Sequence, residues 1–311
     1  MTKRLSCFCC LCCILAHSRI RWLVKFNAQT VDTMKTKTIL ITGGEGGVGA
    51  ATARALAAQG HKVLFTCREP EDGIQLCSDI STAFPRASIK NLTLDLASFS
   101  SIRLFADKLQ REYDQIDVLI NNASIAPLTK QKTRDGFEAQ FGTNYLGHFL
   151  LTQLLLDILN EAGRARIVHT SSMMHWLGNV DFGSFHGEKF YDPIRAYAQS
   201  KLANLLFSNE LSRRLKRTKI TTNAFHPAGT PQEIYFNLPR AAYLTVKPFL
   251  AAPEEGARTA VLLATAPHLS DSTGKYFSKG EPALASPRAR NEDLALKLYE
   301  MSAGLCQVEA L

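Results

Sequence analysis

Residues 37–59 read KTILITGGEGGVGAATARALAAQ, and this stretch decides the fold. Its first part, residues 38–41, is apolar and β-branched, which predicts a buried strand. Glycines then predict a tight turn, which Gly49 closes: Gly43, Gly44, Gly46 and Gly47. The alanine-rich residues 50–58 predict a helix that packs closely on a sheet. Backbone amides and the helix dipole at such a helix start suit a phosphate or pyrophosphate, although a turn that binds nothing is the alternative.

Downstream of this stretch, strand patterns alternate with helix patterns. Further strands are expected at residues 61–67, 89–94, 117–120, 166–170, 220–225 and 274–277. Helices are expected at residues 72–84, 99–113, 144–159, 194–215, 253–264 and 291–301. This alternation predicts one α/β domain with a doubly wound parallel sheet, in which ligands bind at the carboxyl ends of the strands.

The end of the second strand indicates which dinucleotide such a site prefers. In nicotinamide dinucleotide sites, the residue about 20 positions after the glycines faces the adenosine ribose, where an acid suits NAD and a base suits NADP. Cys67 and Arg68 occupy that place, and Arg68 can fork onto a 2′-phosphate. NADP is therefore favoured, while Glu69, a ready partner for Arg68, keeps NAD open. Asp95 is expected to bond the adenine amino group or to stabilise the start of the next helix.

Four polar residues are candidates for catalysis. Tyr197 and Lys201 share one face of a predicted helix, so the ammonium favours the phenolate and suits Tyr197 to acid/base work near neutral pH. The Ser172 hydroxyl can stabilise an oxyanion, and Asn144 can hold a water that passes protons from Lys201 to solvent. Each residue taken alone has a simpler explanation. Tyr197 and Lys201 would be a surface pair on a helix, Ser172 a helix cap, and Asn144 a capping or core asparagine. Together they fall where a doubly wound sheet brings them to one cleft.

The ordered set of motifs resembles the classical short-chain dehydrogenase/reductase family over about residues 36–280. The matching motifs are TGGEGGVG at residues 42–49, Asp95-Leu96, Asn121-Asn122-Ala123, Asn144, Ser172 and Tyr197-x-x-x-Lys201. Three stretches resemble its retinol dehydrogenase-like branch: KTRDGFEAQFGTNYLGHFLLTQLLLD, HGEKFY and AYAQSKLANLLF. The resemblance implies a Rossmann fold, hydride transfer at the nicotinamide C4, and the catalytic tetrad Asn144, Ser172, Tyr197 and Lys201.

The resemblance also implies which residues hold the cofactor. These are Gly43, Gly47, Val48, Gly49, Arg68, Asp95, Leu96, Asn121, Ala123, Tyr197, Lys201, Pro227 and Thr230. The chain departs from the family at two glycines, which are replaced by Ser124 and Ala228. A side chain at either place is expected to crowd the cofactor or displace its loop, while the tetrad stays intact.

Two apolar segments indicate a lipophilic substrate. The insertion between Ser172 and Tyr197 holds large apolar residues that line a pocket or merely pack the insertion: Met173, Met174, Trp176 and Phe182. Residues 228–252 resemble the substrate lid of the family and are rich in aliphatic and aromatic side chains, which suits a lipophilic substrate and contact with a bilayer. His175 is expected to be a loop or pocket residue, and no metal site is expected.

The leading segment carries a short apolar run, LSCFCCLCCILA at residues 5–16, flanked by basic residues. It is too short for a spanning helix, which needs roughly 20 residues, and predicts a membrane-surface anchor over residues 1–25. A signal peptide, or translation from Met34, is the alternative. We therefore expect a leader at residues 1–33 and a catalytic domain at residues 34–311. The expected place is the membrane of the endoplasmic reticulum or a lipid droplet, facing the cytosol, with a cytosolic or a secreted protein as alternatives.

Composition narrows the function further. The net charge is +8, but residues 1–37 hold seven Lys and Arg against one Asp, so the remainder is nearly neutral and no nucleic acid partner is expected. We predict an NADP-preferring oxidoreductase that interconverts an alcohol and its carbonyl on a retinoid, isoprenoid or steroid. The alternative is a dinucleotide-binding scaffold or redox sensor with little catalysis. Family resemblance also implies a homodimer or a tetramer through the helices around Asn144 and Tyr197, whereas a membrane anchor is compatible with a monomer.

Overall fold

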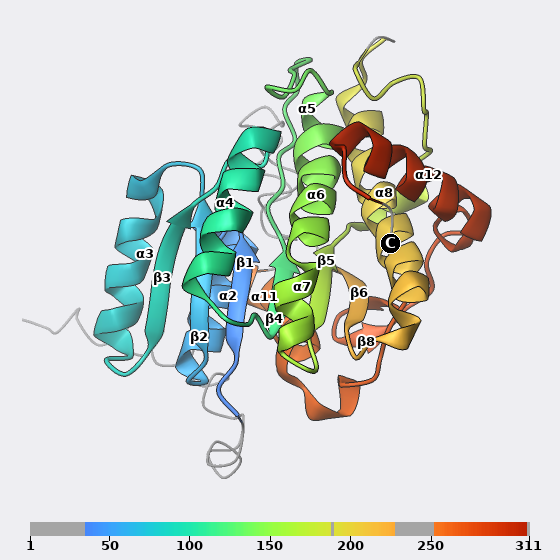
Figure 1. Cartoon of the computed structure of the whole chain (residues 1–311). Coiled ribbons are helices and arrows are strands. Elements are labelled where there is room, and N and C mark those ends of the chain that lie inside the picture. The colour runs from blue at the N-terminus through green and yellow to red at the C-terminus, as the bar shows by residue number, and fades with distance from the viewer. Residues whose placement is uncertain (1–34, 188–189, 228–251, 310–311) are drawn as a thin grey trace, which may run out of the picture. The chain divides into compact units, whose positions relative to one another are not determined.

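The computed structural model describes residues 35–187, 190–227 and 252–309 (Figure 1). The predicted leader and nearly all of the predicted lid lie outside the described residues. Within the described ranges, no helix combines the length and the apolar character needed to cross a membrane.

Strands and helices alternate along most of the described chain. The strands are β1 (Thr38–Thr42), β2 (Lys62–Cys67), β3 (Ser88–Thr93), β4 (Val118–Asn121), β5 (Arg166–Thr170), β6 (Thr221–His226), β7 (Tyr276–Ser278) and β8 (Glu281–Pro282). The α-helices are α2 (Gly47–Ala58), α3 (Pro70–Ala83), α4 (Phe99–Glu112), α5 (Ala139–Phe141), α6 (Gly147–Leu154), α7 (Leu156–Glu161), α8 (Pro193–Arg214), α11 (Pro253–Thr265) and α12 (Glu292–Cys306). A π-helix (Gly142–Leu146) joins α5 to α6, and a 3-10 helix (Met173–Trp176) follows β5.

The described strands form one sheet in the order β3-β2-β1-β4-β5-β6-β7-β8. Neighbouring strands from β3 to β7 are parallel, and β8 pairs antiparallel with β7. Within β1, Ile39 pairs with Val63 of β2 on one side and with Val118 of β4 on the other. The predicted doubly wound parallel sheet, the Rossmann fold, is confirmed.

Helices cover both faces of the sheet, and successive strand residues alternate between the two layers. Ile39 and Ile41 pack in the core cluster formed with α2, α3 and α11, whereas Leu40 packs in the cluster formed with α4, α6, α8 and α12. Figure 1 shows α4, α6 and α8 across one face. Because both faces are covered, β1, β2 and β4 each carry an unbroken apolar run, which is the pattern that predicted them.

The helix predicted at residues 144–159 is wrong in its start and in its regularity. Helical backbone begins at Ala139 and passes through the π-helix Gly142–Leu146 before α6. The first residue of α6, Gly147, allows close packing, because a Cβ there would lie 2.5 Å from the Leu96 carbonyl oxygen. A π-turn inside an α-helix is frequent at functional sites, and here it contains the predicted catalytic asparagine.

The glycine-rich turn ends earlier than predicted. α2 begins at Gly47, so Gly49 lies in the first turn of the helix and does not close the loop. Close packing explains the glycine, because a Cβ on Gly49 would lie 2.0 Å from the Gly43 carbonyl oxygen.

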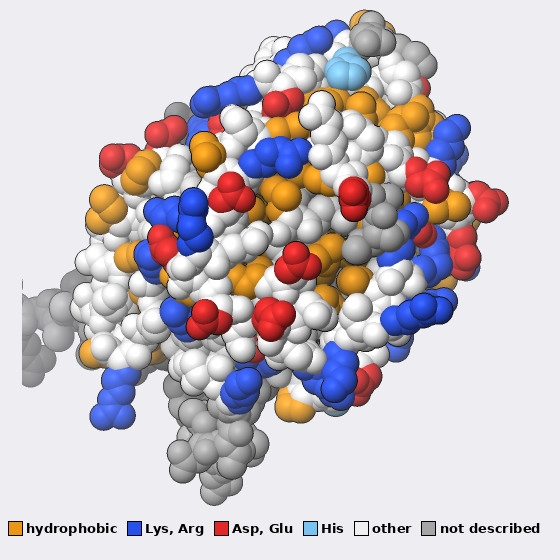
Figure 2. All heavy atoms as spheres, viewed as in Figure 1, with side chains coloured by type: hydrophobic (Ala, Val, Ile, Leu, Met, Phe, Trp, Pro, Cys, Tyr) orange, Lys and Arg blue, Asp and Glu red, His pale blue; other side chains and the backbone are white. Residues whose placement is uncertain are grey.

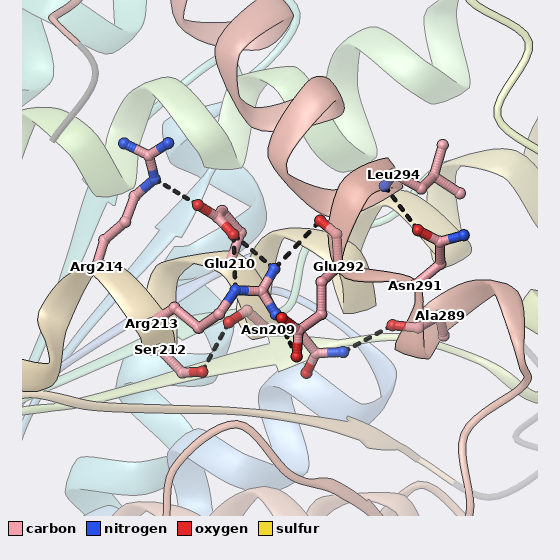
Figure 3. Close-up of polar contacts among 9 residues, drawn as sticks. All are labelled: Asn209, Glu210, Ser212, Arg213, Arg214, Ala289, Asn291, Glu292 and Leu294. Carbon is pink, nitrogen blue, oxygen red and sulfur yellow. Dashed lines mark hydrogen bonds and ion pairs between the residues drawn. The ribbon is translucent and has the colours of Figure 1, made fainter.

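The C-terminal helix α12 extends beyond its predicted range and packs against α8. The buried carboxylate of Glu210, near the end of α8, accepts hydrogen bonds from the guanidinium groups of Arg213 and Arg214 (Figure 3). Arg213 also reaches Glu292 at the start of α12, with 3.7 Å between charged atoms. The Arg214 guanidinium lies 4.1 Å from the centre of the Tyr299 ring. This network fixes α12 on the helix that carries the predicted catalytic tyrosine.

Candidate active site

A cavity of about 420 Å³ lies at the carboxyl ends of the parallel strands. Its wall holds nine of the residues predicted to bind a cofactor: Gly43, Val48, Gly49, Arg68, Asp95, Leu96, Ala123, Tyr197 and Pro227. The glycine-rich turn, the end of β2 and the tyrosine of α8 therefore surround one cavity, at the edge of the sheet where doubly wound folds bind their ligands.

The glycine-rich turn packs closely on the loop after β4 and leaves the start of α2 without a side-chain cap. At Gly43 φ is +64°, and a Cβ there would lie 2.8 Å from the Cα of Ala123. At the start of α2, Gly46 is an N-cap without a side-chain hydrogen bond, and the first turn contains no acidic residue. The first amides of α2, together with the helix dipole, suit a pyrophosphate, so these residues fit NAD(P).

Two buried hydroxyls in the cavity wall support the same fit. Within the described part of the chain, Thr143 Oγ1 and Thr170 Oγ1 have no hydrogen-bond partner, although both residues are more than nine-tenths buried. A buried hydroxyl without a partner is costly, so these two atoms favour a polar ligand in the cavity. Sequence reasoning missed both threonines. Thr170 could have been found from the sequence, because it is the last residue of β5 and therefore lies at the carboxyl edge of the sheet.

Three of the predicted cofactor residues lie elsewhere, and a fourth is not described. Gly47 has φ +48°, which the turn needs where it enters α2. Asn121 is buried and donates from its side-chain amide to Thr152 Oγ1 at 2.9 Å, so it links β4 to α6. Lys201 is fully buried and does not line the cavity, and Thr230 lies outside the described residues.

Arg68 and Asp95, which were predicted to face the adenosine half of the dinucleotide, both lie in the wall of the cavity. The Arg68 side chain is 72% exposed, and its Nε lies 3.8 Å from the Glu69 carboxylate, so the guanidinium is accessible to a ligand. The Asp95 carboxylate accepts from the Ala97 amide at 2.9 Å and lies 3.3 Å from Arg134. Asp95 thus orders the turn after β3 and faces the cavity at the same time.

Tyr197 and Lys201 lie one turn apart on α8, and both are buried. The Lys201 ammonium lies 5.3 Å from the centre of the Tyr197 ring and donates to the Thr170 carbonyl oxygen at 3.4 Å. The Ser171 hydroxyl donates to the Lys201 carbonyl oxygen at 2.8 Å. These bonds fix the face of α8 that carries Tyr197 and Lys201 against the end of β5, directly before Ser172.

Ser172 is the N-cap of the 3-10 helix Met173–Trp176. Behind it lies His175, fully buried, whose Nδ1 donates to the Ser172 carbonyl oxygen at 2.7 Å and whose Nε2 accepts from the Ser286 amide at 3.1 Å. Burial lowers the pKa of His175, which keeps the ring neutral for this pair of bonds. His175 was predicted to be a loop or pocket residue, and it instead holds the backbone of Ser172.

Asn144 lies in the π-helix and holds the loop after β4. Its Oδ1 accepts from the Ile125 amide at 2.8 Å, and its Nδ2 donates to the Ile125 carbonyl oxygen at 2.9 Å. The Asn144 carbonyl oxygen accepts from His148 Nδ1 at 2.9 Å, and His148 Nε2 lies 2.8 Å from Thr42 Oγ1. Burial lowers the pKa of His148 to about 4, so the neutral ring can donate on one side and accept on the other. Sequence reasoning missed His148, although its spacing of four from Asn144 was a signal.

The residues predicted to form an apolar pocket do not line this cavity. Met173 and Trp176 are exposed, whereas Phe182 packs on Phe185 with 5.7 Å between ring centres. In the part of the chain that the structure describes, no group of three or more His, Cys, Asp and Glu residues is placed to hold a metal ion.

Comparison with known proteins places the chain among dehydrogenases. Residues 37–238 match the family model described as short chain dehydrogenase. The chain is 40% identical to retinol dehydrogenase 11 from Homo sapiens over 294 residues, which cover 94% of this chain and 92% of that protein. It is 39% identical to retinol dehydrogenase 13 from Mus musculus over 282 residues, which cover 88% of this chain and 84% of that protein.

Solved structures share the fold. An uncharacterized protein from Mycobacterium Paratuberculosis matches with a TM-score of 0.72 and 33% identity, over 90% of this chain and 98% of that chain. An NAD(P)-dependent gluconate 5-dehydrogenase from Beutenbergia cavernae matches with a TM-score of 0.66 and 21% identity, over 80% of this chain and 96% of that chain. At the lower identity the likeness shows the fold alone.

Proposed function

We propose that this chain, which belongs to the short chain dehydrogenase family, interconverts a lipophilic alcohol and its carbonyl and prefers NADP. Membership of the family makes it an NAD(P)-dependent oxidoreductase that acts on CH–OH groups. The relatives at about 40% identity are named retinol dehydrogenases, which supports a retinoid as the substrate; another isoprenoid or a steroid is the wider class. The observation that carries the reaction type is the buried Lys201 ammonium beneath Tyr197 in the wall of the cavity.

The proposed chemistry divides the work between the nicotinamide and four side chains. The bound cofactor supplies or accepts the hydride. In reduction, the Tyr197 hydroxyl donates its proton to the carbonyl oxygen of the substrate, and in oxidation the phenolate takes the proton back. The Lys201 ammonium favours the phenolate, so the exchange can run near neutral pH. The Ser172 hydroxyl donates a hydrogen bond to the same substrate oxygen and stabilises the charge that develops there.

Asn144 completes the proposed set as the residue that holds a water for proton return to Lys201. Its Nδ2 donates to Ser200 Oγ at 3.2 Å, and Ser200 in turn donates to the Tyr197 carbonyl oxygen at 2.8 Å. These bonds tie the π-helix to the catalytic turn of α8.

The reaction is tested by Tyr197→Phe, which removes only the hydroxyl. We expect kcat/KM for retinal reduction to fall about 10²- to 10⁴-fold, the usual range for loss of an acid/base, while NADPH affinity stays within about twofold. Product retinol is quantified by chromatography, and cofactor binding by fluorescence titration. Tyr113→Phe, at the end of α4, is the matched control and should keep full turnover. Undiminished turnover in Tyr197→Phe would contradict the mechanism.

The cofactor preference is proposed from Arg68, the exposed cation at the end of β2. Arg68→Asp should weaken NADPH binding more than tenfold and leave NADH binding equal or tighter, because a carboxylate repels the 2′-phosphate and can accept from ribose hydroxyls. Dissociation constants for both cofactors are measured side by side. Arg111→Asp on α4 makes the same charge change away from the cavity and should leave the ratio unchanged. An unaltered ratio in Arg68→Asp would rule out the phosphate contact.

A catalytically weak dinucleotide-binding scaffold is the second candidate, because Ser124 puts a side chain in the cavity wall where the family motif has glycine. Binding of NADPH without turnover on retinal, farnesal or a ketosteroid would favour the scaffold. Turnover on one of them would favour the enzyme.

We further propose that residues 1–33 form a leader whose residues 1–25 attach a cytosol-facing domain to a membrane surface, at the endoplasmic reticulum or a lipid droplet. The basic and apolar composition of the segment supports this attachment. The full chain should co-sediment with anionic vesicles, whereas a chain that begins at Met34 should stay in the supernatant. Sedimentation velocity on the shorter chain tests the homodimer that the family suggests.

A further inference from the structure

The adenosine end of the cavity carries more negative than positive charge. Among the described residues of its wall, Arg68 is the one Lys or Arg, and Glu45 and Asp72 lie in the same wall. Glu69 adds a third carboxylate at 3.8 Å from Arg68. A 2′-phosphate at this end would therefore meet one cation and several acids.

Glu45 is the acid that the fold brings from another strand. It belongs to the glycine-rich turn after β1, and the amide of Gly44 donates to the Thr66 carbonyl oxygen of β2 at 2.9 Å. This bond brings the turn to the end of β2, one residue from Glu45 and two residues from Arg68.

The charges at this end act on one another. Partial burial raises the pKa of the Glu45 carboxyl, Asp72 raises it further, and the Arg68 guanidinium opposes the rise. Glu45 lines the same cavity wall as Arg68 and Asp72, so the three charges lie near one another. By the same proximity, the Glu45 carboxylate reduces the positive potential that Arg68 offers to a ligand.

We propose that Glu45 is a specificity-determining residue whose carboxylate offsets Arg68 and so limits the preference for NADP over NAD. The inference rests on the proposed phosphate contact of Arg68. A 2′-phosphate carries up to two negative charges, whereas the NAD ribose offers neutral hydroxyls at that place. The Glu45 carboxylate thus acts against NADP and has little effect on NAD.

The test is Glu45→Gln, which removes the charge and nearly keeps the size of the side chain. Dissociation constants for NADPH and NADH are measured on the full chain at low salt. We expect NADPH to bind about three- to tenfold more tightly and NADH to change less than twofold, as removal of one nearby repulsive charge requires. At 1 M salt, where the Debye length is about 3 Å, the gain should largely disappear. A general structural effect of the substitution would alter both cofactors alike and would not follow salt.

Glu71→Gln is the matched control, since Glu71 lies in the first turn of α3 outside the cavity wall. It should leave the ratio of the two dissociation constants unchanged. Arg68→Ala separates the two hypotheses. If Arg68→Ala weakens NADPH selectively but Glu45→Gln has no effect, the role of Glu45 is overturned and the phosphate contact stands. If neither variant changes the ratio, both are overturned.

Discussion

His148 shows how much of the site depends on single residues behind the cavity. Its ring joins the Asn144 carbonyl oxygen to Thr42 Oγ1, and Thr42 Oγ1 also accepts from the amides of Asn122 and Ala123. One neutral imidazole therefore connects the π-helix, the end of β1 and the loop after β4. These three segments form neighbouring parts of the predicted cofactor site.

His148→Ala should destabilise the fold by about 2–4 kcal/mol, because it leaves a cavity and removes one buried hydrogen bond each from the Asn144 carbonyl oxygen and from Thr42 Oγ1. Urea unfolding measures the free energy, and His268→Ala, at an exposed position, is the control. The double variant with Thr42→Val should lose less than the sum of the single losses, by more than about 0.5 kcal/mol. Strict additivity would show that the two side chains act independently.

At the scale of the element, the start of α2 depends on the absence of a side chain. Gly49→Ala would place a Cβ 2.0 Å from the Gly43 carbonyl oxygen and 2.8 Å from Asn122 Nδ2, so the turn must shift. We expect NADPH affinity to fall at least tenfold and the melting temperature to drop.

Gly304→Ala in α12 is the natural contrast, because a Cβ there meets no atom within 4 Å. Replacing a helical glycine by alanine in open space should stabilise the chain by about 0.5–1 kcal/mol. Both variants are compared by thermal unfolding with and without NADPH. Equal effects of the two substitutions would contradict the packing argument.

Elements with strong local signals could be predicted, and those fixed by distant contacts could not. β5 begins and ends at its predicted residues, and its local signal is the β-branched pair Ile167 and Val168 at its centre. Ser98 is the N-cap of α4, and its hydroxyl accepts from the Ser101 amide. The two-residue strand β8 has no periodic pattern of its own and forms only against β7.

The same division holds within the candidate site. Tyr197 and Lys201 could be paired from the sequence because a spacing of four sets their geometry on any helix. The roles of Glu45 and Thr143 could not, because each depends on the approach of separate strands and helices. Asn121 was predicted to touch the cofactor, but its side chain turns toward α6, a choice that only the packing of α6 against β4 decides.

At the scale of the whole molecule, buried histidines make stability depend on pH. Burial lowers the pKa of His148 and His226 to about 4 and that of His169 to about 3, and it also lowers the pKa of His61 and His175. Below pH 6.5 the unfolded chain binds protons that the folded chain cannot, so stability falls as pH falls toward 4. Each such histidine contributes a slope of up to about 1.4 kcal/mol per pH unit. Glu138, whose pKa burial raises, contributes in the opposite direction near pH 4.5.

Urea unfolding at several pH values between 7.5 and 4.5 should therefore show a loss of several kcal/mol below pH 6.5. His169→Gln should reduce the slope of stability against pH. It removes one buried ring that binds a proton in the unfolded chain but is held neutral in the fold, next to Asn121 and Thr222. His268→Gln, at an exposed position, should leave the slope unchanged. A flat profile would show that the buried rings gain protons without loss of structure.

The strand order has a consequence for synthesis on the ribosome. Once β4 has joined the open side of β1, every later strand up to β8 adds to the outer edge left by its predecessor, in the order in which the chain is made. No pairing has to open to admit a later strand, so the nascent chain can fold in the direction of translation. A ribosome that stalls before residue 166 leaves β4 as an uncovered parallel edge. Such truncated chains should aggregate and depend on chaperones.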